Sequence, residues 1–255
     1  CKDVEQITIL DILKQKDCSF YFSGMKNLRK INNFKYLIVN NCENMVCMFY
    51  QCNRLEYLNL RSFNTSKVKY MDGMFQECES LKTLDLRSFD TSNVVSMTTM
   101  FADCRSLEEL NISSFDTSKV ENMNAMFVIC VKLKTLDLSN FDTSNVKGML
   151  SMFNGCNSLK ELNLNNFKTS NVKEMRDMFY KCFSLKELNL SNFDFSSAIM
   201  DDMFEDCMNL KRLKLSDTLY SLSIKMFSNC NNLNSIEWKG KVYSFEDIKE
   251  YTEVY

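Results

Sequence analysis

Residues 78–103 read CESLKTLDLRSFDTSNVVSMTTMFAD, and close copies of this 26-residue string fill most of the 255-residue chain. The dipeptide Met-Phe marks each copy, first at Met48 and Phe49, and it returns after 26 residues five times, then after 25 and 23. A cysteine follows each of these phenylalanines after three residues, in all eight copies. A fixed period of this length is the signature of a stacked repeat architecture, so we expect one elongated solenoid.

The first half of each copy has the pattern of a short strand. Leu84 and Leu86 alternate with polar Asp85, as residues of a half-buried strand do, and the same Leu-x-Leu alternation returns in the other copies. Strands that recur once per coil in the same direction pair in parallel, joined by right-handed crossovers. The pattern therefore predicts a ladder of short parallel strands along one side of the solenoid.

The second half of each copy has helix-like spacing. The run Asp-Thr-Ser at 90–92 offers side chains that cap helix N-termini, and the apolar residues after it recur at steps of three and four, at Val94, Met97, Phe101 and Cys104. We expect a helix of about three turns here. Packed helices need ~8–10 Å and parallel strands only ~4.8 Å, so the stack should bend. The predicted fold is an α/β right-handed solenoid with strands on the concave face and helices on the convex face.

The run Leu-x-x-Leu-x-Leu, as at Leu81, Leu84 and Leu86, resembles the leucine-rich repeat. The whole unit, with F-D-T-S-N-V and M-F-x-x-C-x-S-L, is similar to the BspA-like leucine-rich repeat surface proteins of bacteria and some protozoan parasites, over about residues 45–238. The resemblance implies a surface or adhesive binding role without implying a ligand. Phenylalanine stands where most leucine-rich repeats place a tethering asparagine. We therefore expect a buried Phe spine in place of an asparagine ladder, with turn hydrogen bonds from Asp-Thr-Ser.

The two ends depart from the repeat and predict caps. Residues 1–27 should form an N-terminal cap, 28–238 a solenoid of about eight units with degenerate first and last units, and 239–255 a C-terminal cap, all in one folded domain. Ser244 and Asp247 resemble a capping box before a short polar helix. Trp238 is expected to seal the last coil. Cys1 leaves two alternatives open, a lipid-modified mature N-terminus or an arbitrary start of the chain.

Twelve cysteines raise the questions of disulfides and metals. The eight that share one repeat position should be free thiols that fill the core, because side chains stacked in one inward-pointing ladder are poorly placed to pair. The even spacing of Cys42, Cys47 and Cys52 could suit a metal cluster, but the chain has no histidine and no C-x-x-C pair. A calcium ladder at Asp90, Asp116 and Asp142 would be broken by Lys168 in the next copy. No metal and no cofactor is predicted.

Composition argues against several classes of function. The 31 basic and 33 acidic residues leave a net charge of -2, whereas nucleic-acid binders usually carry a concentrated basic face. The longest apolar runs are too short to cross a bilayer. The absence of histidine removes every Ser-His or Cys-His arrangement, and no Gly-rich phosphate loop or nucleophile elbow occurs. We predict a chain that is not an enzyme and has no catalytic residue.

The candidate binding surface is the concave face. Polar residues around the leucines of seven strands should form a strip ~30 Å long, enough for an ordinary protein interface. The predicted partner-binding residues are Tyr57, Asn59, Arg61, Thr83, Asp85, Arg87, Glu109, Asn111, Thr135, Asp137, Glu161, Asn163, Glu187, Asn189, Arg212 and Lys214. The expected partner is a host or matrix protein met at the cell surface or after secretion. A structural spacer and a cytosolic interaction scaffold are the alternatives, and the oligomeric state is not predicted.

Overall fold

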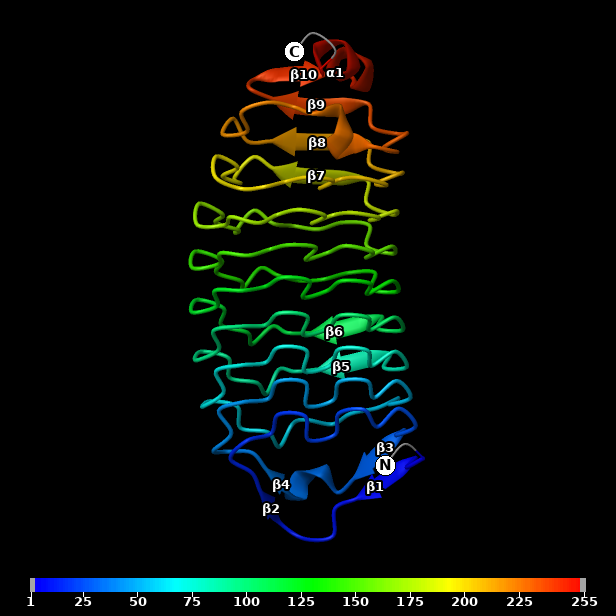
Figure 1. Cartoon of the computed structure of the whole chain (residues 1–255), viewed down its shortest axis with the longest axis vertical. Coiled ribbons are helices and arrows are strands. Elements are labelled where there is room, and N and C mark those ends of the chain that lie inside the picture. The colour runs from blue at the N-terminus through cyan, green and yellow to red at the C-terminus, as the bar shows by residue number, and fades with distance from the viewer. Residues whose placement is uncertain (1–2, 253–255) are drawn as a thin grey trace.

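Coils of similar width are stacked one on the next along the whole chain, from the N-terminal end (blue) to the C-terminal end (red) (Figure 1). This computed structural model describes residues 3–252, so the prediction for Cys1 lies outside the described residues. The architecture is a β-solenoid of about ten turns. The predicted repeat solenoid is confirmed, and its division into two caps and a central array stays a prediction.

Leu-x-Leu segments stack along one side of the coil, which we call the LxL face (57–61, 83–87, 109–113, 135–139, 161–165, 187–191 and 212–216). Strand β5 (Thr83–Asp85) pairs in parallel with β6 (Glu109–Asn111), so that Leu84 lies opposite Leu110. Strand β7 (Glu187–Leu190) pairs with β8 (Arg212–Leu215), and β8 pairs with β9 (Ser235–Trp238). The segments at 57–61, 135–139 and 161–165 follow the same path without pairing as strands. The predicted ladder is therefore present but interrupted.

The other long side of the coil overturns the prediction of outer helices. We call it the MF face (45–52, 71–78, 97–104, 123–130, 149–156, 175–182 and 200–207). Each of its segments is a run of three tight turns, closed for example by hydrogen bonds from Met74 N to Met71 O (3.2 Å), from Gln76 N to Gly73 O (3.1 Å) and from Cys78 N to Phe75 O (3.1 Å). Within residues 3–252 the one α-helix is α1 (Phe245–Thr252), at the C-terminal end.

The chain avoids a helix on the MF face because two residues per coil have left-handed backbone angles. Gly73 (φ 58°) and Glu77 (φ 59°) flank Phe75 in this way, and the equivalent positions of the other coils repeat the arrangement. A left-handed residue cannot continue a right-handed helix. A run of turns whose end residues face the core also places apolar side chains three apart, so the spacing fits both structures.

Peptide groups on the MF face bond between coils. Phe75 N donates to Met100 O (2.9 Å), while the carbonyl of the same peptide, Met74 O, accepts from Phe49 N (2.9 Å). Each MF segment, from the one at 45–51 to the one at 175–181, donates four such hydrogen bonds, and in every case the N–H group points toward the next coil. Both long faces are therefore held at strand-like spacing. The predicted bend depended on the wider spacing of packed helices along one face. Since turns take the place of those helices, this reason for one concave and one convex face no longer holds.

Two columns of phenylalanine fill the core. The rings of the Met-Phe motifs, from Phe49 to Phe227, stack in one column that Phe22 extends at the N-terminal end, with centroids 5.4–5.8 Å apart and planes within 2–10° of parallel. The predicted spine that includes Phe89 and Phe167 is also buried, at 2% exposure each. The prediction that this spine takes the place of an asparagine ladder was wrong, however. Side-chain amides of Asn140, Asn166 and Asn192 donate to carbonyl oxygens one coil back, at 2.6–3.1 Å.

The Asp-Thr-Ser run links coils instead of capping helices. The buried Thr117 hydroxyl donates to Asp142 O (2.9 Å) and accepts from Asp142 N (2.9 Å), one coil further on. The aspartates close local turns, as where Asp116 Oδ1 accepts from Ser118 N (2.9 Å). Predicted turn hydrogen bonds are therefore confirmed, but without a helix N-terminus.

The thiol column is buried and unpaired, as predicted. Its eight members are Cys52, Cys78, Cys104, Cys130, Cys156, Cys182, Cys207 and Cys230. Each thiol donates to the carbonyl of a phenylalanine in the preceding coil, as Cys104 Sγ does to Phe75 O (3.2 Å). The thiols thus satisfy backbone acceptors in addition to filling space.

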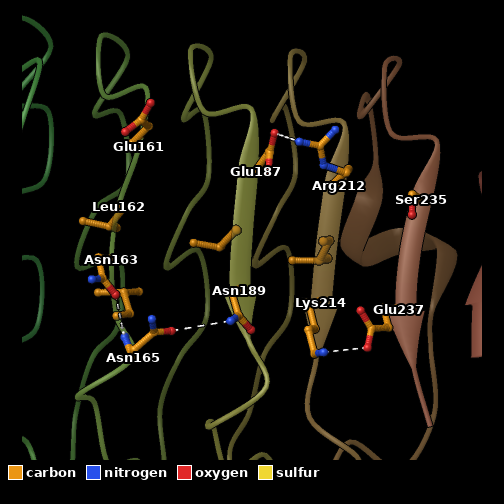
Figure 2. A pocket seen from close by; sticks show the side chains of 13 residues that line it. Glu161, Leu162, Asn163, Asn165, Glu187, Asn189, Arg212, Lys214, Ser235 and Glu237 are labelled. Carbon is orange, nitrogen blue, oxygen red and sulfur yellow. Dashed lines mark hydrogen bonds and ion pairs between the residues drawn. The ribbon is translucent and has the colours of Figure 1, made fainter. Parts of the chain in front are cut away.

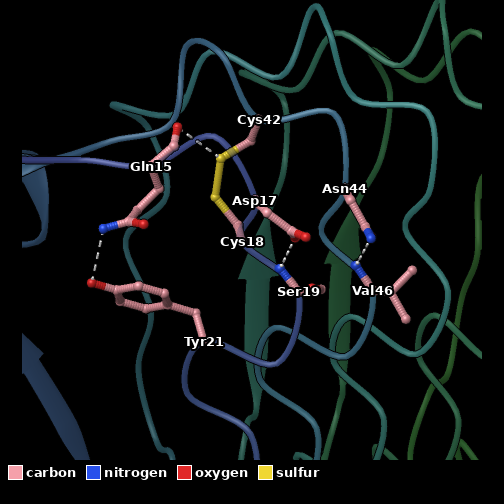
Figure 3. Close-up of a disulfide and its surroundings, with 8 residues drawn as sticks. All are labelled: Gln15, Asp17, Cys18, Ser19, Tyr21, Cys42, Asn44 and Val46. Atoms are coloured by element: carbon pink, nitrogen blue, oxygen red, sulfur yellow. Dashed lines mark hydrogen bonds between the residues drawn. A yellow bond between two sulfur atoms is a disulfide. The ribbon is translucent and has the colours of Figure 1, made fainter.

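The sequence prediction missed a disulfide between Cys18 and Cys42 (Figure 3). The two residues are 24 apart in sequence, with an S–S distance of 2.05 Å, and both side chains are fully buried. They join the first two coils, where β1 (Gln6–Thr8) pairs with β3 (Lys30–Asn32) and β2 (Leu13–Lys14) with β4 (Leu37–Ile38). A short 3₁₀ helix, η1 (Phe34–Tyr36), lies between β3 and β4.

The C-terminal end closes the stack. A 3₁₀ helix, η2 (Ile224–Phe227), takes the place of the last MF turns, and β10 (Lys241–Tyr243) pairs antiparallel with β9. The capping box at α1 is confirmed, because Ser244 N donates to Asp247 Oδ2 (2.7 Å) and Asp247 N donates to Ser244 Oγ (3.2 Å). Trp238 is 4% exposed, as expected of a residue that seals the last coil.

Candidate functional site

The LxL face gathers all sixteen predicted partner-binding residues. Fourteen of them are exposed, and Asp85 and Lys214 are half-buried. They reach the same face because side chains on both sides of each inward-facing Leu-x-Leu pair point away from the core. The leucines between them form the floor, where Leu110 is half-buried and Leu136 is 9% exposed.

Two shallow hollows open on this face. The larger one, of about 820 Å³, lies where the segments at 135–137 and 161–163 run beside β5 and β6 without pairing as strands. Its floor includes Leu110 and Leu136, and its rim includes Glu109, Asp137 and Glu161. The smaller one, of about 450 Å³, lies over residues 161–165 and strands β7 to β9 (Figure 2). Neither is an enclosed cavity, so the face suits a broad contact better than a small molecule.

At each end of the LxL face, charged side chains form ion pairs with neighbours at the same end. Asp85 accepts from Arg87 Nη2 (2.9 Å) and from Arg61 Nη2 (3.4 Å). Hydrogen bonds from the Arg87 side chain and backbone hold the pKa of Asp85 well below its ordinary value. At the other end Arg212 pairs with Glu187, and Lys214 Nζ lies 2.6 Å from Glu237 Oε1 (Figure 2). Exposed pairs of this kind add little stability, so they remain open to exchange for a partner's charges.

The middle of the face has carboxylates without cations. Glu109 and Glu161 form no ion pair with another described residue, and Asp137 Oδ1 accepts from the backbone N–H of Ser139 (3.0 Å). That hydrogen bond and one from the Ser139 side chain lower the pKa of Asp137, which keeps it ionised. The larger hollow therefore combines an apolar floor with an unbalanced negative rim.

Sequence reasoning missed two residues of this surface, Ser235 and Glu237, which line the smaller hollow from β9. Their signal was present, since Ile236 and Trp238 continue the alternation of the Leu-x-Leu segments. Among residues 3–252, no group of three or more candidate metal-ligating side chains comes together. In the same part of the chain, no helix has the length and hydropathy needed to span a bilayer.

Residues 16–127 and 101–218 both match the family described as Mycoplasma protein of unknown function, DUF285. The chain belongs to this family. No curated protein matches the DUF285 chain.

Several solved bacterial structures are similar to the DUF285 chain. A leucine-rich repeat protein from Bacteroides ovatus is 17% identical, with 91% of this chain and 68% of that chain covered and a TM-score of 0.45. A leucine-rich cell surface protein from Faecalibacterium prausnitzii is 17% identical, with 94% of this chain and 89% of that chain covered and a TM-score of 0.36. The pneumococcal vaccine antigen PcpA is 15% identical, with 95% of this chain and 58% of that chain covered and a TM-score of 0.43.

Proposed function

We propose that this DUF285 chain is a non-enzymatic module that binds a protein partner at a cell surface through the LxL face. The observation that carries the proposal is the larger hollow, where Leu110 and Leu136 form an apolar floor beside the unpaired carboxylates Glu109 and Glu161. An apolar centre with charges around it is the usual anatomy of a protein interface. The partner that fits is a protein segment with an apolar side chain flanked by lysine or arginine.

The paired ends of the face support the same proposal. A partner with a basic segment gains most from the unpaired carboxylates in the middle, while Arg61 and Arg87 at one end and Lys214 at the other discourage a shifted register. Tyr57 is the one aromatic side chain among the sixteen predicted residues and is 61% exposed. Because aromatic anchors dominate the tightest interfaces, we expect a moderate affinity that depends on salt.

Display outside the cytoplasm is supported by the disulfide between Cys18 and Cys42, since such bonds persist in oxidising compartments. The eight column thiols are compatible with that location because they are buried. A spacer without a ligand of its own, or a cytosolic scaffold, would leave the hollow unused.

The test neutralises the middle of the face without changing its shape. Glu109→Gln, Asp137→Asn and Glu161→Gln are combined in one variant, and Glu43→Gln, Glu121→Gln and Asp201→Asn form a control with the same change in charge elsewhere. Each protein is coupled to beads and incubated with an extract of host-cell surface and matrix proteins. We expect the control to capture the same proteins as the wild type and the hollow variant to lose them. Identical capture by all three proteins would favour the spacer.

A further inference from the structure

One column of charged side chains changes its pattern halfway along the stack. It consists of the residue that follows the first leucine in eight successive repeats, in the order Arg29, Glu56, Lys82, Glu108, Lys134, Lys160, Lys186 and Lys211, and it ends at the uncharged Asn234 of the next coil. The first five alternate in sign, and ion pairs join Arg29 to Glu56 (2.7 Å) and Lys134 to Glu108 (3.1 Å). From Lys134 onward every member is a lysine.

Three of these lysines, which we call the lysine row, have no counter-charge. Lys160, Lys186 and Lys211 are exposed, and none forms an ion pair with another described residue. Backbone hydrogen bonds from Lys186 N to Lys160 O (3.4 Å) and from Lys211 N to Lys186 O (2.8 Å) place them on adjacent coils in register. Like charges directly opposite one another destabilise a sheet. The row therefore opposes folding, whereas the alternating half of the same column favours it.

The surroundings of the lysine row add hydrogen-bond acceptors. The side-chain amides of Asn209 and Asn232 donate to Phe183 O and Met208 O, both at 2.7 Å, and these bonds turn each Oδ1 away from the backbone acceptor. Both asparagines are exposed, so their Oδ1 atoms can accept from hydroxyl groups of a ligand. Met208, 41% exposed, supplies apolar surface on the same edge.

We propose that the lysine row binds a linear anionic polysaccharide. Three point charges spaced ~4.8 Å apart suit sulfate or phosphate groups along a chain. An acidic peptide would be better served by arginine, whose fork binds carboxylates bidentately, but the one arginine beside the row, Arg212, is paired with Glu187. Single-stranded nucleic acid needs exposed rings for stacking, and the exposed aromatic residues of the described chain lie outside the row, at Phe20, Tyr57, Tyr70 and Tyr220.

This site borders the LxL face, because each of its lysines directly precedes a residue of that face. Its lysines differ from every residue of the proposed protein-binding set, so either site can be changed without substituting a residue of the other. The two proposals can therefore succeed or fail independently.

The experiment measures binding of dextran sulfate to the whole chain, with neutral dextran as the control ligand. We expect Lys160→Gln, Lys186→Gln and Lys211→Gln together to weaken binding by about tenfold or more, and added salt to weaken wild-type binding. A matched variant, Lys67→Gln, Lys119→Gln and Lys173→Gln, changes the net charge equally at exposed positions and should bind as the wild type does. Equal loss in both variants, or no loss in either, would overturn the proposal.

A single substitution separates a ligand site from a merely solvated surface. Lys186→Glu places a negative charge between Lys160 and Lys211, so that the three members of the row alternate in sign, and we expect it to raise the melting temperature while it weakens binding of dextran sulfate. Polyglutamate and an oligodeoxythymidine are measured in parallel. If either binds the row more tightly than dextran sulfate at equal charge, the polysaccharide assignment is wrong.

Discussion

The MF face and the LxL face belong to the same coils but are held together differently. On the MF face four peptide N–H groups of each coil from 45–51 to 175–181 bond to the next coil. On the LxL face β5 pairs with β6 and β7 to β9 pair with one another, while the segments between these groups do not pair as strands. The repeated Met-Phe motif therefore maintains the stack, which leaves the LxL face free to carry varied side chains.

The MF face also holds unfavourable backbone angles that the rest of the coil must offset. Thr99 (φ 54°) and Ile129 (φ 59°) are β-branched residues in the left-handed region, where such residues are rare. Each costs roughly 1–2 kcal/mol. Hydrogen-bonded peptides aligned along the axis strengthen one another, and the stacked phenylalanines add burial. Disrupting the MF face should therefore lower the free energy of unfolding far more than changing the LxL face.

The largest expected effect comes from high pH, which acts on the thiols at the ends of the MF segments. Burial raises the pKa of Cys104 and Cys156 from an ordinary 9.0 to about 12. Above pH 9 the unfolded chain loses these protons and the folded chain keeps them, so stability is complete below pH 9 and falls as the pH rises toward 12. Each buried thiol adds a slope of up to about 1.4 kcal/mol per pH unit. Urea unfolding at a series of pH values checks the trend.

The control for this prediction is Cys104→Ala combined with Cys156→Ala. The double variant should be less stable at pH 7 but should lose less stability between pH 9 and pH 11 than the wild type. An equal loss in both proteins would show that groups other than these thiols control the alkaline transition.

The second prediction compares one aromatic side chain from each face. Phe127 is fully buried between Phe101 and Phe153, with centroids 5.6 and 5.8 Å away. Phe127→Ala should lower the free energy of unfolding by about 3–5 kcal/mol, because it leaves a cavity and removes two stacking contacts. Tyr57→Ala on the LxL face should change it by no more than about 0.5 kcal/mol. Similar losses in the two variants would remove the distinction between the faces.

The sequence predicted the parts of the fold that depend on period and burial. The 26-residue repeat, the inward leucines, the buried phenylalanines and the capping box at Ser244 all follow from which side chains recur and where. The helices failed because a turn and a helix place apolar residues at the same spacing. A sequence does not show whether an N–H bonds within its own turn or to the next coil. Gly73 and Gly155, inside the predicted helices, were the available signal.

The disulfide and the site were readable to different extents. Cys18 and Cys42 are 24 residues apart, close to one period, so a shared position on adjacent coils could have been inferred. Membership of the LxL face follows from alternation alone. The pairing of Asp85 with two arginines, and the missing pairing at Glu109 and Glu161, depends on side-chain reach between coils and was not accessible from the sequence.

The third prediction uses the same substitution on two threonines. Thr117→Val removes the hydroxyl that donates to Asp142 O and accepts from Asp142 N, so two backbone groups lose their partner. We expect a loss of about 1–3 kcal/mol in the free energy of unfolding. Thr135→Val on the LxL face keeps the β-branched shape at an exposed position and should change stability by no more than about 0.5 kcal/mol. Denaturation in urea measures the stability of the two variants. If Thr117→Val caused no loss, the buried threonine hydroxyls would not be what links one coil to the next.

The smallest expected effect tests the left-handed positions of the MF face in both directions. Lys181 (φ 58°) occupies the position that Gly155 (φ 72°) occupies one coil earlier. Lys181→Gly relieves a left-handed strain that exceeds the entropy cost of glycine, so we expect a gain of about 0.5 kcal/mol. Gly155→Ala should lose about 1 kcal/mol, because a Cβ there would lie 3.3 Å from Ile129 Cα and in a strained backbone region. Changes of the same sign in the two melting temperatures would mean that these residues do not share one conformation, and the tight turns of the MF face would need to be reassigned.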